Sequence, residues 1–263
     1  MPLLLIFFIV CFAASTIGAI CGIGGGIIIK PVLDAFHVMD VATINFLSGC
    51  TVLSMTTYSV IKGRLSGESH INKSIGFPLG IGAALGGLAG KWMFSFISAL
   101  SPEKNKIGAI QAICLSIITL GTLIYTICKE KISTHNITNP IICILIGLFL
   151  GIFSSFLGIG GGPINLVVLF YFFSMQTKAA AENSLYIIFF SQIANLMASV
   201  FTGSLPEFNI FLLILMIIGG ITGGVCGRLL NKKIQDKTVD KLFLALMVVI
   251  IMINLYNIYI FIH

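Results

Sequence analysis

Charged residues are scarce in this sequence. Asp, Glu, Lys and Arg together make up 9% of the 263 residues, whereas about 25% is typical of a soluble domain. Hydrophobic residues make up 57%, and the mean hydropathy is +1.09. A soluble fold of this length needs far more polar surface to remain in water. The shortage of charge therefore excludes a soluble globular domain.

Several functional signatures are also missing. None of the seven cysteines belongs to a C-x-x-C pair, which argues against a disulfide framework or a cysteine metal site. No Lys-Ser or Lys-Thr follows a glycine cluster, as a phosphate-binding loop requires. The four histidines (His37, His70, His135 and His263) fall in polar connections or at the terminus. We therefore expect a protein that is not an enzyme and that holds neither a metal ion nor a cofactor.

Long uncharged segments dominate what remains. A helix needs about 20 apolar residues to cross a bilayer, and the apolar content of these segments is continuous rather than alternating as in a barrel strand. The basic residues stand singly or in pairs between the segments, as membrane topology signals do, so we expect no nucleic-acid partner. The sequence predicts an all-α integral membrane protein. The segments without Asp, Glu, Lys or Arg are residues 1–29, 41–61, 107–128, 137–177, 183–206, 208–227 and 242–263.

One pattern occurs twice. The motif Gly-Ile-Gly-Gly-Gly at residues 22–26 recurs at residues 158–162, each time after an apolar segment and before a short apolar arm. Gly-Gly-x-x-Gly at residues 86–90 likewise recurs at residues 223–227, and we assign these two runs to close helix packing. We therefore predict two homologous repeats, at residues 1–130 and 136–263. Beyond each arm we expect three helices, near residues 41–61, 75–98 and 107–128, and near residues 181–204, 208–229 and 241–262.

The number of membrane crossings stays open at this point. About four transmembrane helices per repeat, with a Gly-broken or re-entrant first helix, give eight spans and up to ten membrane segments. If each cluster breaks one crossing, the repeats are parallel and the 15 Lys and Arg residues divide 10 to 5 between the two sides of the membrane. If each cluster is the tip of a hairpin, the repeats are inverted and the division is 11 to 4. Both arrangements place Arg228, Lys232, Lys233, Lys237 and Lys241 on the cytoplasmic side.

Three consecutive glycines inside an apolar segment point to a ligand site. Each costs a helix about 1 kcal/mol relative to Ala, and broken backbone at membrane depth survives only where protein or a wet cavity surrounds it. The break exposes N–H groups at the positive end of the next helix, which suits an anion. Paired broken helices in two halves are typical of a transporter's central site. A tight turn or close helix crossing without a ligand is the alternative for each cluster.

Both glycine clusters resemble a known family. Gly-x-Gly-Gly-Gly followed by Pro31, and the same motif directly followed by Pro163, are similar to those of the TauE/SafE sulfite exporters, also called TSUP permeases. The resemblance covers essentially the whole chain. It implies an inner-membrane permease for sulfur-containing anions such as sulfite, sulfonates or thiosulfate. Because the proline follows the second cluster directly but not the first, the two arms need not share one geometry.

We expect the anion to bind between the two glycine hairpins. The predicted donors are the backbone N–H groups of the last three glycines in each motif, completed by polar side chains on the arms and following helices. For each of these side chains, a hydrogen bond between helices is the alternative. The predicted site comprises Gly24, Gly25, Gly26, Asn45, Ser48, Gly160, Gly161, Gly162, Asn165, Asn183 and Ser184.

Two charged residues lie near this predicted site. Lys30 is a candidate to neutralise the anion and Glu182 to carry a coupling proton, although we favour a position at the membrane interface for both. Lys91 and Arg228, at matching helix ends, are interpreted as topology anchors. Gln192 and Asn195 either line a pathway or join helices, and the sequence does not separate these roles.

We therefore predict a secondary transporter, with export as the favoured direction. The alternative is a membrane channel or a structural membrane subunit that moves no sulfur anion. The expected partners are a small sulfur oxyanion and the lipid bilayer, and a homodimer is an open alternative.

Overall fold

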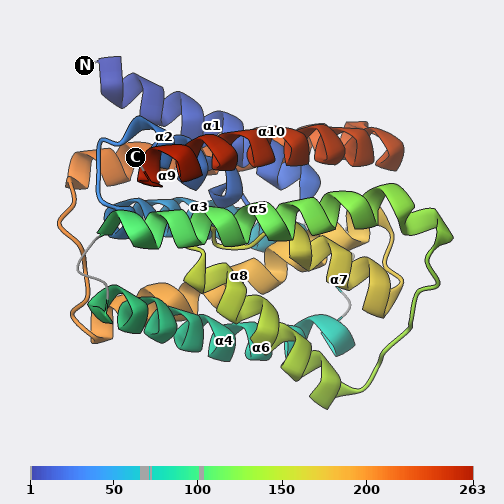
Figure 1. Cartoon of the computed structure of the whole chain (residues 1–263). Coiled ribbons are helices and arrows are strands. Elements are labelled where there is room, and N and C mark those ends of the chain that lie inside the picture. The colour runs from blue at the N-terminus through green and yellow to red at the C-terminus, as the bar shows by residue number, and fades with distance from the viewer. Residues whose placement is uncertain (1, 66–70, 72, 101–103, 263) are drawn as a thin grey trace.

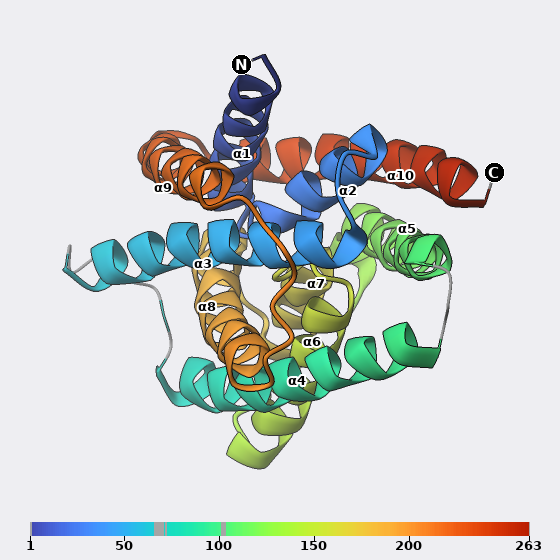
Figure 2. The same ribbon diagram turned by 90° about the vertical axis from the view of Figure 1, so that its left-hand side faces the viewer.

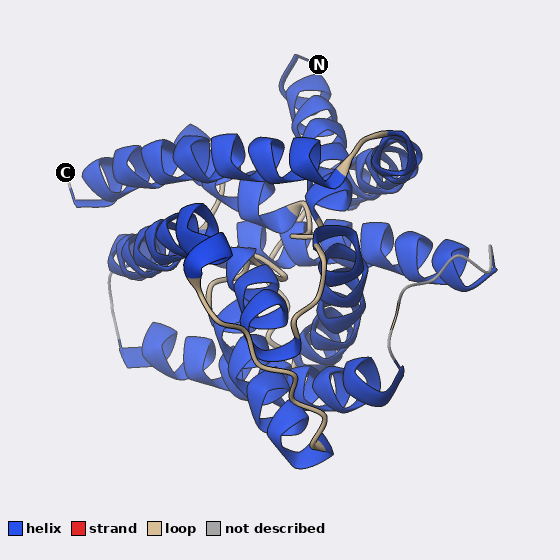
Figure 3. Ribbon diagram, turned by 90° about the vertical axis from the view of Figure 1, so that its right-hand side faces the viewer, coloured by secondary structure: helices blue, strands red, loops and turns tan. Residues whose placement is uncertain are grey.

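Helices make up nearly all of the chain. The computed structural model describes residues 2–65, 71, 73–100 and 104–262, and within these ranges it contains no strand (Figures 1 and 3). The all-α prediction is confirmed. The helices are α1 (Pro2–Cys21), α2 (Gly26–Phe36), α3 (Val41–Leu65), α4 (Lys73–Leu100), α5 (Lys104–Cys128), the 3-10 turn η1 (Lys129–Lys131), α6 (Pro140–Phe156), α7 (Pro163–Phe173), α8 (Thr177–Phe201), α9 (Ile210–Lys233) and α10 (Asp236–Ile262).

The helix order agrees with the sequence. Each glycine cluster lies between a longer apolar helix and an arm of 11 residues, and three long helices follow each arm. The long helices begin or end within a few residues of the predicted bounds. Seven helices in the described ranges are long and apolar enough to cross a membrane, whereas α6, with 17 residues, is slightly shorter. The chain is therefore a multi-pass membrane protein.

Helix ends gather at two opposite ends of the molecule. At one end, Lys129 after α5 forms an ion pair with Asp240 near the start of α10, and Thr177 at the start of α8 bonds the same carboxylate. The end of α3 and the end of α9 also lie there, because Arg228 donates to the Ser59 carbonyl oxygen at 2.8 Å. We call this the lysine-rich end and its opposite the far end.

At the far end, a different set of helix ends meets. The ring of His37, after α2, lies 5.1 Å from that of Phe261 at the end of α10. Thr43, near the start of α3, donates to the Glu207 carbonyl oxygen just before α9. Both ends of the α1–α2 segment therefore lie toward the far end, and both ends of α6–α7 lie toward the lysine-rich end (Figure 1).

The α1–α9 contact is built on small residues. Gly219, Gly223 and Gly227 of α9 face successive carbonyl oxygens of α1, and a methyl group on either of the last two would come within 3.0 Å of such an oxygen. Only glycine lets the two backbones approach this closely. Figure 2 shows α1, α9 and α10 along one side of the molecule.

The α4–α6 contact, on the opposite side in Figure 2, follows the same pattern. Gly82, Gly86 and Gly90 of α4 each lie against a carbonyl oxygen of α6, again within 3.0 Å of an added methyl group. The packing role that the sequence predicted for the two Gly-Gly-x-x-Gly runs is confirmed. Both contacts join a helix from residues 1–130 to one from residues 136–263, so the two parts of the chain interlock.

Candidate functional site: the paired glycine loops and the cavities beside them

The two glycine loops share positive φ angles at two matching positions, the first and third residues of the motif. The first glycine of each motif has φ of +76° at Gly22 and +66° at Gly158. The third residue has +74° at Gly24 and +73° at Gly160. Side chains with a Cβ rarely adopt these angles, so glycine is required at both places. The shared sequence motif therefore encodes a shared turn.

The first loop folds back on the helix that precedes it. The amide groups of Gly22 and Ile23 both donate to the Gly18 carbonyl oxygen. A methyl group on Gly25 would lie 2.9 Å from the Ser15 hydroxyl, so the start of α2 lies beside a residue two turns before the end of α1. The α1–α2 unit is therefore a hairpin with the glycine cluster at its tip.

The second arm begins differently from the first. Pro163 is the first residue of α7, a position where its missing N–H costs nothing, and Gly162 precedes it in an extended conformation. Pro31 instead lies inside α2, which begins at Gly26. The two arms therefore differ in geometry, which the unequal proline positions had left open. The consequence is that α7 offers one backbone donor fewer in its first turn than α2.

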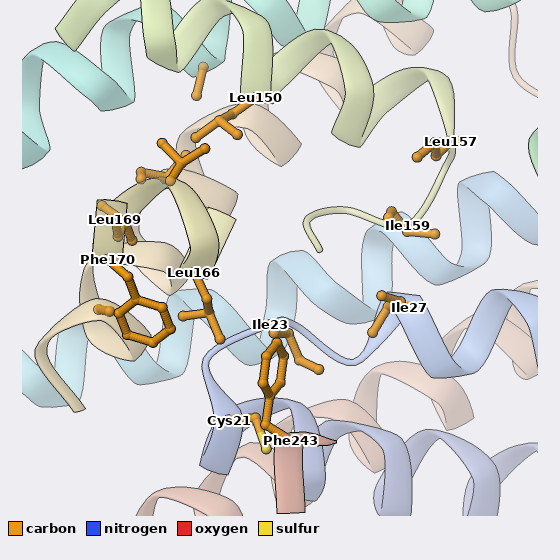
Figure 4. Close-up of a cluster of buried hydrophobic side chains, with 14 of the residues drawn as sticks. Cys21, Ile23, Ile27, Leu150, Leu157, Ile159, Leu166, Leu169, Phe170 and Phe243 are labelled. Atoms are coloured by element: carbon orange, nitrogen blue, oxygen red, sulfur yellow. The ribbon is translucent and has the colours of Figure 1, made fainter. Parts of the chain in front are cut away.

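The tips of the two hairpins meet near the centre of the protein. A methyl group on Gly26 would collide with the Ile159 carbonyl oxygen of the second loop. The Ile27 and Ile159 side chains also lie close together in the buried hydrophobic cluster (Figure 4). The side chains of Val52 in α3 and Ile188 in α8 both lie beside Gly24, and so cover the first loop.

Backbone donors are free at both tips. Six predicted glycines donate no backbone hydrogen bond to any residue that the structure describes. They are Gly24, Gly25, Gly26, Gly160, Gly161 and Gly162. Buried N–H groups without an acceptor are rare in proteins. A ligand that accepts hydrogen bonds would satisfy them, and an anion is the natural one.

Most of the predicted polar side chains are buried around these tips. Ser48, Ser184 and Asn165 are at most 1% exposed, and the Ser48 and Ser184 hydroxyls and the Asn165 carbonyl oxygen have no hydrogen-bond partner among the described residues. Asn45 lies directly against Gly158 of the second loop. Asn183 is also buried, but it lies against Gly76 of α4 and donates to the Ala179 carbonyl oxygen of its own helix.

Gln192 is the residue that the sequence left undecided and that the structure brings to the loops. It is 1% exposed, and neither atom of its side-chain amide has a partner within the described ranges. Its amide lies 3.2 Å from a methyl group placed on Gly160 and 2.9 Å from one placed on Gly49. Ser15, against Gly25, is a further unpaired hydroxyl that the sequence analysis missed. A polar residue in an apolar span was the available signal for both.

A cavity opens beside the first glycine loop, at the lysine-rich end. Its volume is about 460 Å³, and we call it the basic cavity. Three cationic side chains and one carboxylate line it, which suits an anion. Gly22 packs against Ala181 in its wall, so the cavity reaches the first hairpin tip. It is lined by Ala19, Ser59, Lys178, Ala181, Glu182, Leu185, Arg228, Asn231 and Lys232.

Space at the tips themselves is small. A cavity bordered by Gly161, Gly162 and Asn165 has a volume of about 10 Å³, which is room for about one water molecule. A cavity of about 410 Å³ opens at the far end instead, bordered by Asp34, His37 and Asn105 among others. In this conformation the hairpin tips are packed together, and an anion larger than water needs them to separate.

Lys30 differs from the expectation of an interfacial residue. It is 2% exposed and forms an ion pair with Asp34, one turn later in α2, at 2.6 Å. The interfacial position expected for Lys30 leaves out Asp34, which is its ion-pair partner within the protein. A buried charge needs a counter-charge, and the i, i+4 spacing on α2 supplies one. Glu182 is half-buried and lines the basic cavity.

The fold and these cavities define a class: a multi-pass helical membrane protein with two glycine-tipped hairpins and a basic vestibule. The chain matches the profile of the sulfite exporter TauE/SafE family over residues 7–254 and belongs to this family. The resemblance that the glycine motifs indicated is thereby confirmed. Neither the curated proteins nor the solved structures gave a match.

Proposed function

We propose that this protein is a secondary transporter that exports a small sulfur-containing anion such as sulfite, a sulfonate or thiosulfate. Membership of the sulfite exporter TauE/SafE family supports the class. The observation that carries the proposal is the basic cavity, because it brings three cationic side chains to the wall of the first glycine loop. An anion drawn into this cavity arrives next to unpaired backbone donors.

The site that we propose lies between the two hairpin tips. The N–H groups of the six glycines donate to the anion's oxygens, and the Ser48, Ser184, Asn45 and Asn165 side chains complete the shell. Gln192 joins them, because its unpaired amide lies beside Gly160. Leaving buried polar groups unpaired is costly, so a ligand that satisfies them would bind favourably here.

The proposed architecture is two inverted repeats, at residues 1–130 and 136–263. The supporting observation is that the glycine contacts correspond. Gly219, Gly223 and Gly227 meet carbonyl oxygens of Phe8, Phe12 and Thr16, whereas Gly82, Gly86 and Gly90 meet those of Ile144, Leu148 and Ile152. Each residue of one set lies 136 or 137 positions from its counterpart. Because the two hairpins enter from opposite ends, the repeats are inverted, an arrangement typical of secondary transporters.

The lysine-rich end is proposed to face the cytoplasm of a cell with the protein in its inner membrane. Of the 15 Lys and Arg residues, only Lys30, Lys91, Lys104 and Lys106 lie away from that end. The remaining 11 match the division expected for inverted repeats. Positive residues favour the cytoplasmic side, so the basic cavity opens to the cytoplasm, where an exporter collects its substrate.

Glu182 is proposed to couple transport to protons. It lines the basic cavity together with Lys178 and Arg228. An ionisable residue on the substrate path of a membrane protein is a candidate for such a coupling role. No nucleotide-binding motif is present in the sequence, so an ion gradient is the natural driving force.

The test is flux of labelled anions in proteoliposomes. Sulfite, thiosulfate, a sulfonate and sulfate are supplied with and without a proton gradient, and the Glu182→Gln variant is measured alongside. We expect saturable movement of at least one sulfur oxyanion, and loss of the gradient's effect in the variant. Flux that never saturates would favour the channel alternative. Failure of all four anions with folded protein would refute the proposed substrate class.

A further inference from the structure

A small cavity at the far end has the composition of an anion site. Its volume is about 20 Å³, and Asn45, Lys91, Ser155, Gly158 and Asn195 are among its lining residues. Among the described residues, no Asp or Glu borders it. It lies against the second glycine loop, since Asn45 is in contact with Gly158.

Three polar groups in this cavity have no hydrogen-bond partner among the described residues. They are the Ser155 hydroxyl and the side-chain carbonyl oxygens of Asn45 and Asn195. Ser155 is 4% exposed and Asn195 is 9% exposed. Buried polar groups normally have partners, and the half-buried Lys91 lines the same cavity as these three groups. The Lys91 ammonium, the Ser155 hydroxyl and the side-chain N–H groups of Asn45 and Asn195 can donate hydrogen bonds to an oxyanion, whereas the two unpaired amide oxygens can only accept them.

This small cavity corresponds to the basic cavity position by position. Asn45 and Ser155 line the small cavity, and Ala181 and Ala19 line the basic cavity. Asn45 and Ala181 lie 136 residues apart in the sequence, as do Ser155 and Ala19, so each pair consists of equivalent residues of the two cavities. Asn45 contacts Gly158, and Ala181 contacts Gly22, which is the first glycine of the other motif.

Two further pairs of lining residues correspond, and one of them is a pair of cations. Asn195 matches Ser59 at the same separation, and Lys91 matches Arg228, which follows the Gly-Gly-x-x-Gly run of α9 as Lys91 follows that of α4. Chance overlap of two unrelated cavities would not preserve both the contacts and the spacing.

The two cavities differ mainly in how far they are open. The basic cavity has a volume of about 460 Å³ and its counterpart about 20 Å³. Phe46 and Phe94 fill the far-end cavity at the positions where Glu182 and Asn231 line the basic one. The Lys91 ammonium lies 5.8 Å from the centre of the Phe94 ring, so an aromatic face covers the cation that would otherwise attract an anion.

We propose that this closed cavity is a second binding site for the same small sulfur oxyanion. The anion leaves or enters the protein through this site at the far end. Lys91 is the charge that recognises the anion there, with Ser155, Asn45 and Asn195 as hydrogen-bonding partners. The site opens when the basic cavity closes, so that the two glycine loops are exposed to one side of the membrane at a time. This inference rests on the proposed transport function.

The test compares the two faces of the membrane in vesicles of known orientation. The half-saturating anion concentration is measured from each face for wild type, Lys91→Gln and Lys91→Arg. Lys106→Gln is the matched control, because it removes a positive charge at the far end outside the cavity. We expect Lys91→Gln to raise the half-saturating concentration at the far face by about tenfold, as loss of a charge-assisted hydrogen bond predicts. Its value at the lysine-rich face should change much less, and Lys91→Arg should restore the far-face value.

Three results would overturn the inference while leaving transport intact. The first is an unchanged half-saturating concentration at the far face in Lys91→Gln, and the second is an equal change in the Lys106→Gln control. The third is failure of Lys91→Arg to restore binding, which would show that Lys91 acts through packing. Arg228→Gln serves as the reciprocal variant and should weaken binding at the lysine-rich face only. Absence of flux in wild type is a separate result, and it would refute the proposed function itself.

Discussion

Adding one methyl group at Gly18 tests whether the first glycine cluster is the tip of a hairpin. In the structure, the methyl group of Gly18→Ala would lie 2.5 Å from the Gly24 carbonyl carbon and 2.6 Å from the Gly25 nitrogen. Ordinary contact begins at 3.4 Å, so the loop backbone must move by about 0.9 Å. Both neighbours are backbone atoms, which cannot rotate away as the end of a side chain can.

Gly121→Ala is the matched control. Gly121 lies in α5, and a methyl group placed on it has no atom of the described residues within 4 Å. Both variants make the same chemical change inside a helix, and each gains up to about 1 kcal/mol in helix propensity. The difference between them therefore isolates the cost of overpacking, which is about 1–3 kcal/mol.

Thermal unfolding of the detergent-solubilised protein measures this difference. For a chain of this size, 1 kcal/mol shifts Tm by about 2–4 °C. We therefore expect Gly18→Ala to melt about 2–12 °C below Gly121→Ala. It should also transport more slowly, because the displaced loop carries the proposed donors. Equal melting temperatures and equal transport would show that the loop does not fold back on α1, and the hairpin would be refuted.

Four further variants test other parts of the structure. Gly161→Val should abolish transport but not membrane insertion, because Gly161 has φ of +156° and lies against Ile188; normal uptake would argue against the loop site. Lys30→Met should cost about 3–5 kcal/mol in unfolding free energy, because it leaves Asp34 buried without its cation. The double variant Lys30→Met with Asp34→Leu should recover most of that loss, and a single variant as stable as wild type would show that the ion pair does not form. Gln192→Leu should leave stability unchanged or raise it by about 1–3 kcal/mol, because it removes two unpaired polar atoms. Its transport should nevertheless fall, and normal transport would remove Gln192 from the proposed site.

Local patterns in the sequence were enough to predict the helices. The span predicted near residues 41–61 is α3, and the span predicted near residues 107–128 is α5. These predictions succeeded because the length and continuity of an apolar segment decide whether it forms a membrane helix. The recurring glycine motif similarly predicted two breaks, since repeated glycines are costly inside a helix.

Contacts between distant segments decided the rest. Whether each cluster broke one crossing or formed a hairpin tip depended on the packing of Gly25 against Ser15, which no local pattern contains. The orientation of α8 turned Asn183 toward Gly76 of α4 and brought Gln192 to Gly160. The sequence by itself determined a membrane protein of this family with two glycine turns, because hydropathy and backbone freedom are local properties. Only the tertiary structure decided which polar residues meet at those turns and which cavity is open, because both depend on how the two interlocked parts of the chain pack.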